Sequence, residues 1–189
     1  MRLLLTAALA VAAVFGLLTL GAGESRAAEG KTLIVYFSWG GNTRQIAQQI
    51  QKRVGGDLFE VEREKAYPTE YRATTQEARK ELDSNARPAL KRDKVPNLAD
   101  YDVVFIGTPN WWGTLPTPVM TFLEANDLSG KTVAQFITHE GSGVGRSSSD
   151  LKRLAPKASF TEVLAIRGGR VSGAQGEVDG WLKSIGLAK

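Results

Sequence analysis

Apolar residues along the chain form short continuous runs that alternate with amphipathic stretches. Five runs are rich in β-branched and aromatic residues and are short enough to be buried strands. They cover residues 32–38, 57–61, 102–109, 131–139 and 158–166. Continuous apolar runs, as opposed to strict alternation, are typical of a parallel sheet that is covered on both faces. The pattern therefore predicts a parallel β-sheet between two layers of helices.

Between these runs, apolar side chains recur at the spacing of helical turns. Helices are predicted over residues 43–54, 69–86, 146–155 and 178–185, and in the segment that starts at Pro116. The buried face of the second helix is expected to carry Tyr71, Thr75, Ala78 and Leu82. Five strands alternating with five helices indicate an α/β protein of three layers. The chain shows no internal repeat and no sign of a second domain.

The N-terminal segment has a different character. Arg2 is followed by apolar and small residues from 3 to 22, and residues 25–27 form a small-x-small cleavage signature. This arrangement is typical of a secretory signal peptide. We therefore expect residues 1–27 to be removed, residues 28–189 to form the domain, and the protein to be periplasmic or secreted. A retained N-terminal membrane anchor is the alternative, because about 20 apolar residues can span a bilayer.

Composition excludes several classes of protein. The chain has no cysteine, which excludes disulfides and thiolate metal sites, and its single histidine, His139, excludes a multi-histidine metal centre. The formal net charge is +4 and falls by one on cleavage after Ala27, yet no Lys/Arg run is dense enough to indicate nucleic-acid binding. Any redox chemistry must therefore come from a bound cofactor, and no metal is expected.

Ligands of an open parallel sheet bind at the carboxyl ends of its strands. The loop at residues 38–43 occupies that edge and leads directly into a helix, whose unpaired N–H groups can hold a phosphate without a lysine. Ser38 and Thr43 add hydroxyl donors, and Asn42 adds an amide. Gly40 and Gly41 let the backbone approach closely. A plain turn is the alternative, because the same residue types are common in turns.

The loop after the third predicted strand contains two adjacent tryptophans, Trp111 and Trp112, between Pro109 and Gly113. Neither a core helix nor a strand explains them there. Large flat rings at a ligand-binding edge favour stacking on a planar ligand. The alternative is that one of the two rings packs beneath the loop.

Two rival motifs are incomplete. Residues 125–132 end in Gly-Lys-Thr but begin with Ala125, where a P-loop has glycine, and a strand follows instead of a helix. His139 could serve as a base, but the sequence has no G-x-S-x-G elbow, and Ser142 between two glycines is not presented as a nucleophile. Neither a P-loop site nor a Ser-His-acid hydrolase is therefore expected.

The segments YFSWGGNT, GTPNWWGTLPTPV, DLSGKTV and THEGSGVGRS, in this order and spacing, resemble the flavodoxin family, in particular its bacterial flavodoxin-like branch. The segment YPTEYRATTQEARKEL, followed by Arg87-Pro88, is similar to that branch as well. The resemblance extends from about Lys31 to Lys189. It implies a doubly wound five-stranded parallel sheet of order 2-1-3-4-5 that binds FMN, with the phosphate in the first loop and the isoalloxazine between the other two.

The resemblance also implies a role for each matching residue. The phosphate would be held by Ser38, Gly40, Gly41, Asn42 and Thr43. One side of the ring would be lined by Pro109, Asn110, Trp111, Trp112 and Gly113. The other side would be closed by Thr138, His139, Glu140, Gly141 and Gly143. The chain departs from the family at Gly40, where a hydroxyl residue is usual. No insertion splits the predicted fifth strand, so the chain resembles the short-chain form of the flavodoxins.

Flavodoxin-type proteins exchange electrons through FMN, so the resemblance implies a redox protein that transfers electrons between partners outside the cytoplasm. The partners would be redox proteins or a quinone, and a basic chain suits acidic proteins or an anionic membrane surface. One alternative is an FMN-dependent NAD(P)H:quinone oxidoreductase, which export disfavours because nicotinamide nucleotides are cytoplasmic. The other is a binding module that has kept the fold and lost the flavin.

Overall fold

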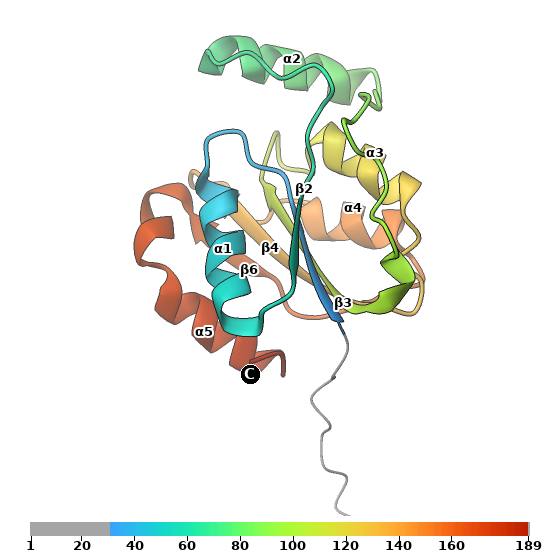
Figure 1. Ribbon diagram of the computed structural model, residues 1–189. Helices are drawn as coiled ribbons and strands as arrows, with labels where there is room; N and C mark the ends of the chain where they lie inside the picture. Colours follow the sequence, from blue (N-terminus) through green and yellow to red (C-terminus); the bar gives the residue numbers. More distant parts are fainter. Residues whose placement is uncertain (1–30, 189) are drawn as a thin grey trace, which may run out of the picture.

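The computed structural model describes residues 31–188, so the predicted signal peptide lies outside the described residues. Its centre is a parallel sheet of strand order β2-β1-β3-β4-β5, which confirms the predicted topology (Figure 1). A sixth strand, β6, also pairs with β4. The strands are β1 (Lys31–Tyr36), β2 (Asp57–Glu60), β3 (Tyr101–Pro109), β4 (Thr132–His139), β5 (Ser159–Phe160) and β6 (Leu164–Arg167).

The described part of the chain contains five α-helices, in agreement with the sequence pattern. They are α1 (Asn42–Val54), α2 (Tyr71–Asp83), α3 (Thr117–Ala125), α4 (Ser147–Leu154) and α5 (Gln175–Ser184). Two short 3₁₀ helices, η1 (Leu98–Asp100) and η2 (Gly168–Gly173), complete the structure. Within residues 31–188, none of these helices has the length and apolar character needed to cross a membrane.

The sheet buries apolar side chains on both of its faces. Leu33 and Val35 of β1 belong to one core cluster, which also contains residues of α3 and α4. Ile34 and Tyr36 belong to the opposite cluster, together with residues of α1 and α5. Figure 1 shows these two helix pairs on opposite sides of the sheet. Because consecutive residues enter different cores, the strands read as continuous apolar runs.

The predicted fifth strand is interrupted, so the expectation of an unbroken strand was wrong. Ser159 and Phe160 lie opposite Thr132 and Val133, whereas Leu164 lies opposite Phe136. Three residues of this edge therefore face two residues of β4, which is the geometry of a β-bulge. The polar residues Thr161 and Glu162 fall at this point, where the apolar run is weakest.

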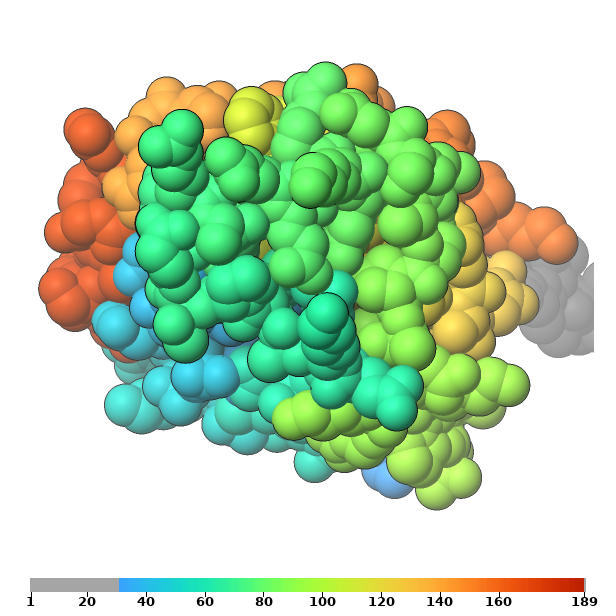
Figure 2. Space-filling model, turned by 90° about the horizontal axis from the view of Figure 1, so that it is seen from above, coloured from blue at the N-terminus to red at the C-terminus, as the bar shows by residue number. Residues whose placement is uncertain are grey.

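Helix α2 lies over the carboxyl ends of the strands (Figure 1), and the green atoms of this region cover much of the face seen in Figure 2. The helix begins at Tyr71 because the Glu70 carboxylate accepts hydrogen bonds from the backbone N–H groups of Arg72 and Ala73, at 2.8 and 2.6 Å. The predicted buried face is only partly correct. Ala78 is buried, but Tyr71 is 70% exposed because the first turn overhangs the sheet edge.

We expect Gly107→Ala to lower the free energy of unfolding by roughly 1–3 kcal/mol, because overpacking strains a filled core. A Cβ on Gly107 would lie 2.0 Å from the ring of Phe136. The control is Gly180→Ala in α5, where the Cβ meets open space and helix propensity should raise stability by about 0.5–1 kcal/mol. Urea denaturation measures both changes. An unaltered midpoint for Gly107→Ala would contradict this account of the core.

Candidate ligand-binding site at the carboxyl edge of the sheet

The start of α1 presents free backbone donors at this edge. Gly41 has a φ of 89° and donates its N–H to the Ser38 hydroxyl oxygen at 3.1 Å, which turns the chain into the helix. The N–H of Gln45 donates to Gly41 O at 3.0 Å. The N–H groups of Asn42, Thr43 and Arg44 precede it and have no intrahelical acceptor. This turn can therefore receive an anion.

A buried hydroxyl pair joins the start of α1 to the end of β4. Thr43 Oγ1 and Thr138 Oγ1 lie 2.8 Å apart, and both residues are buried. Each side chain still borders the cavity described below. The hydroxyl of Thr43 thus has one protein partner and keeps its remaining hydrogen-bonding capacity for a ligand.

The tryptophan loop closes in a tight turn. The backbone groups of Trp111 and Thr114 exchange hydrogen bonds at 3.1 and 3.0 Å, and the two residues between them, Trp112 and Gly113, have φ values of 52° and 78°. Two left-handed residues in succession define a type I′ turn. The left-handed conformation costs Trp112 roughly 1–2 kcal/mol. Its indole N–H offsets part of this cost by donating to Thr75 O at 3.1 Å.

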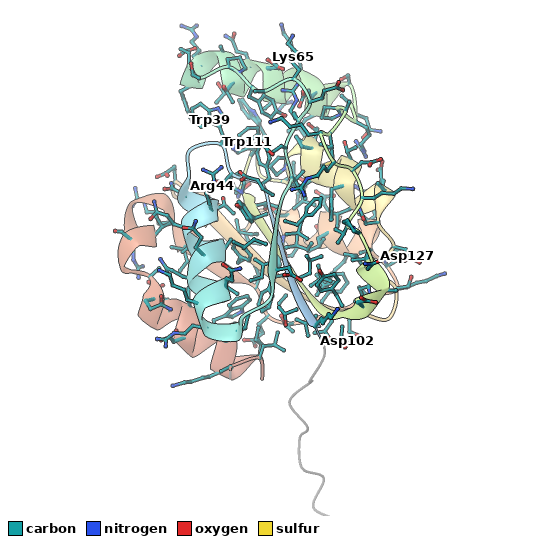
Figure 3. All side chains as sticks on the ribbon, in the orientation of Figure 1. Trp39, Arg44, Lys65, Asp102, Trp111 and Asp127 are labelled. Atoms are coloured by element: carbon teal, nitrogen blue, oxygen red, sulfur yellow. The ribbon has the colours of Figure 1, made fainter. Side chains whose placement is uncertain are left out.

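Trp111 packs beneath this loop on a rigid aromatic base. Its ring meets those of Phe37 and Tyr67 edge to face, with centroids 5.3 and 5.1 Å apart. The Tyr67 hydroxyl donates to Glu81, and burial together with this carboxylate raises the pKa of Tyr67 above its usual value. Arg63 completes the base through a 3.1 Å ion pair with Glu81. Trp111 and Trp112 therefore differ in environment, and Figure 3 shows Trp111 below α2.

The loop after β4 is fastened to the tryptophan loop. Asn110 donates from Nδ2 to Gly143 O at 2.7 Å and from its backbone N–H to Thr138 O at 2.8 Å. A Cβ on Gly145 would lie only 2.5 Å from Gly113 O, so the two loops touch through glycines. Asn110 Oδ1 is buried and has no hydrogen-bond partner among the described residues. Such an atom points to a ligand or water as its partner.

His139 and Glu140 have different surroundings in this loop. Nδ1 of His139 accepts the backbone N–H of Gly141 at 3.0 Å, so this nitrogen helps to shape the turn. A Cβ on Gly168 would lie 2.0 Å from Glu140 Oε1 and 2.6 Å from Asn42 Nδ2. The Glu140 carboxylate is therefore next to the first loop. The role that the resemblance implies for it, closing one side of a ring, stays a prediction.

The three loops enclose a cavity of about 310 Å³, which we call the loop cavity. It brings together ten of the residues predicted from the sequence: Ser38, Gly40, Asn42, Thr43, Pro109, Asn110, Trp111, Thr138, His139 and Glu140. Five predicted residues lie outside its lining: Gly41, Trp112, Gly113, Gly141 and Gly143. These four glycines have positive φ and shape the turns around the cavity. The roles of all these residues toward a ligand stay predictions.

Sequence reasoning missed three residues that line the loop cavity: Trp39, Tyr71 and Ser142. Trp39 could have been found, since it is an aromatic residue within the predicted phosphate loop. Tyr71 gave no such signal, because its place depends on where α2 packs. In Figure 3 the side chain of Trp39 lies between the first loop and α2.

A second hollow of about 370 Å³, which we call the aromatic crevice, adjoins the loop cavity. It shares four wall residues with that cavity: Trp39, Tyr71, Asn110 and Trp111. Its other wall residues are Thr74, Thr75 and Ala78 of α2, together with Trp112. Within residues 31–188, no group of three or more His, Cys, Asp or Glu side chains could hold a metal ion.

The flavodoxin family model matches residues 31–185, which is most of the chain. The chain belongs to the flavodoxin family. It is similar to a crystal structure of a candidate flavoprotein from Bacteroides eggerthii, with 33% identity, a TM-score of 0.72, and coverage of 82% of this chain and 97% of the other. A candidate flavoprotein from Bacteroides uniformis shares 31% identity, with a TM-score of 0.72 and coverage of 82% and 98%.

A flavoprotein from Lactobacillus acidophilus, crystallised in complex with FMN, is also similar to this flavodoxin-family chain. The two share 28% identity with a TM-score of 0.62, over 80% of this chain and 98% of the other.

We expect the two loop tryptophans to differ in their effect on stability. Trp111→Ala should lower the free energy of unfolding by about 2–3 kcal/mol, less than the cost of removing a fully buried ring, because Trp111 is packed on one side and only partly buried. Trp112→Asn should change it by less than about 1 kcal/mol, because Asn-Gly favours a type I′ turn and Trp112 is 53% exposed. Denaturant unfolding without added ligand measures both. Equal losses would show that Trp111 is not the packed ring.

Proposed function

We propose that this flavodoxin-family chain is an FMN-binding redox protein that transfers electrons between partners outside the cytoplasm. The observation that carries the proposal is the loop cavity, where the free N–H groups of α1 face the same space as the ring of Trp111. A helix start suits a phosphate, and an aromatic wall suits a flat ring. The FMN complex of the similar protein from Lactobacillus acidophilus supports this choice of cofactor.

The residues of the loop cavity fit the two ends of FMN. Ser38, Asn42 and Thr43 would hold the phosphate together with the backbone N–H groups around Gly40. The unpaired Asn110 Oδ1 would accept a hydrogen bond from an N–H or O–H group of the flavin. FMN supplies the electron transfer when it is bound, and the protein binds it, orients it and sets its environment.

Charge around the cavity bears on how the cofactor is held. Arg44 in the first turn of α1 forms an ion pair with Glu60 of β2, with Nη2 and Oε1 2.5 Å apart. The Glu60 carboxylate therefore neutralises much of the positive charge of Arg44. The phosphate would therefore depend on backbone and hydroxyl donors. The Glu140 carboxylate borders the same cavity and disfavours additional negative charge there. This repulsion acts on a phosphate in the first loop, next to which Glu140 lies, so the N–H groups at the start of α1 must outweigh it.

Export and the nature of the partners belong to the same proposal. The apolar N-terminal run and its small-x-small site support removal of residues 1–27 and function in the periplasm or the medium. The basic net charge supports an acidic partner protein or an anionic surface. Export of an unfolded chain would require FMN to be acquired after folding.

We expect wild-type protein to bind FMN much more tightly than riboflavin, which lacks the phosphate. Thr43→Ala should weaken FMN binding by roughly tenfold to a hundredfold, because a hydrogen bond to a charged group contributes about 1.5–3 kcal/mol. Riboflavin affinity should hardly change. Titration of flavin fluorescence with purified protein measures both dissociation constants.

Thr43→Ser is the matched control, since it keeps the hydroxyl that contacts Thr138. It should retain most of the FMN affinity. If wild-type protein binds FMN and riboflavin equally well, the first loop does not bind phosphate. If it binds neither flavin, the binding-module alternative replaces the redox proposal.

We expect the exported protein to begin near Ala28. Signal peptidases cleave after small-x-small sites, and residues 25–27 provide one directly before it. The intact mass of protein recovered from the periplasm or the medium tests the position of cleavage. A mass that includes residues 1–27 in a membrane fraction would favour the anchored alternative.

A further inference from the structure

A polar residue lies in the apolar run of β4. Gln135 is on the same face of the sheet as Val133, which packs in the core cluster that contains Leu151 of α4. Only 4% of the surface of Gln135 is exposed. Its Oε1 accepts the hydroxyl hydrogen of Ser148 at 2.6 Å, but its Nε2 is buried and has no hydrogen-bond partner among the described residues. A buried amide donor of this kind is costly unless a ligand or water accepts its hydrogen.

Gln135 lines a hollow of about 550 Å³ between α4 and the interrupted edge of the sheet, which we call the α4 hollow. Ser148 and Lys152 of α4 form one wall, and residues 160–163, at the bulge between β5 and β6, form the other. The α4 hollow shares no lining residue with the loop cavity or the aromatic crevice. It is therefore separate from the site described above.

Hydrogen bonds fix the bulge that forms the outer wall. The N–H of Thr161 donates to Val133 O of β4 at 3.1 Å, and the indole N–H of Trp181 in α5 donates to Glu162 O at 2.9 Å. Leu164 then resumes the pairing with β4. The bulge is thus bonded to the sheet on both sides and to α5 at its centre, so the α4 hollow is a fixed feature of the fold.

The lining combines an amide donor, charged groups and apolar surface. The ammonium of Lys152, an exposed residue, is 5.8 Å from the centroid of the Phe160 ring. Phe160 and Val163 are only partly buried and supply apolar surface. A single negative charge could pair with Lys152 and accept the free amide hydrogen of Gln135. A second one would meet the carboxylate of Glu162 and the negative end of α4, since Lys152 lies in the last turn of that helix.

We propose that the α4 hollow binds a small monocarboxylate that has an apolar body. One carboxylate oxygen accepts a hydrogen bond from Gln135 Nε2, the charge faces the ammonium of Lys152, and the apolar body lies against the ring of Phe160. A single water molecule would pair with the amide but would leave the ammonium and the apolar wall unused. The inference goes beyond the proposed function and does not depend on a bound flavin.

The test is a titration of benzoate into ¹⁵N-labelled protein, both FMN-loaded and flavin-free, followed by NMR. We expect the side-chain amide signal of Gln135 to shift saturably in both forms, because this amide donates to the carboxylate. Benzamide keeps the ring and a carbonyl acceptor but lacks the charge. It should bind about twofold to fivefold more weakly than benzoate, the usual contribution of an ion pair at an exposed position.

Lys152→Gln should weaken benzoate binding by the same twofold to fivefold, whereas Lys152→Arg, which keeps the charge, should retain most of the affinity. Lys157→Gln is the matched control, since it removes the same charge from an exposed position outside the lining of the hollow. It should bind benzoate like the wild type.

Gln135→Met removes the amide while keeping a side chain of similar length. It should weaken benzoate binding by roughly tenfold to a hundredfold, the usual effect of losing a hydrogen bond to a charged group. The backbone amide signals of Thr161 and Val163 report binding in this variant. If Gln135→Met fails to fold, the exposed Lys152 and Lys157 variants still decide the question.

Several results would overturn the inference. If no saturable shift occurs, the amide of Gln135 holds a water molecule only. Equal losses in Lys152→Gln and Lys157→Gln, or equal affinity for benzamide, would show that Lys152 does not pair with a carboxylate. Tighter binding of benzylamine would show that the hollow takes a cation.

One comparison separates this inference from the proposed function. If FMN displaces benzoate, the carboxylate lies in the loop cavity and the inference is wrong, although FMN binding stands. If FMN does not bind but benzoate shifts the Gln135 amide, with the loss in Lys152→Gln, the α4 hollow is confirmed as a carboxylate site and the proposed function fails.

Discussion

Burial of the parallel sheet on both faces is the constraint on which the rest of this structure depends. Adjacent residues such as Leu33 and Ile34 enter opposite cores, so helices must cover both sides of the sheet. Each helix then returns the chain to the same starting edge, and the loops after the strands collect at the other edge. The loops after β1, β3 and β4 therefore meet at one place, where they enclose the loop cavity. The site is thus a consequence of how the core is covered.

Hydrogen bonds between these loops fix their positions relative to one another. The Thr43 and Thr138 hydroxyls join the first loop to the third, and Asn110 joins the second to the third. Trp111 is held from below by Phe37 and Tyr67. The arrangement leaves free the N–H groups at the start of α1 and one side-chain oxygen, Asn110 Oδ1. A ligand with a phosphate at one end and a flat, hydrogen-bonding ring at the other matches this set of groups.

Helix α2 adds a second hollow that the sheet alone would not provide. Because it lies over the carboxyl edge, it turns an open rim into the aromatic crevice beside the loop cavity. The two hollows differ in chemistry, since one offers backbone and hydroxyl donors and the other offers neutral ring surface. The two hollows share four wall residues and are therefore adjacent.

The sequence by itself determined the α/β class, the number of helices and the three loops that form the site, because periodicity and turn residues are local properties. The strand order and most of the loop cavity followed from the resemblance to flavodoxins. The bulge between β5 and β6, the exposure of Tyr71 and the different environments of Trp111 and Trp112 did not. The hydrogen bond from Trp112 to Thr75 joins residues 37 positions apart, and the base of Trp111 combines residues of three separate segments. Contacts of this kind depend on how α2 packs over the sheet edge, which only the tertiary structure decided.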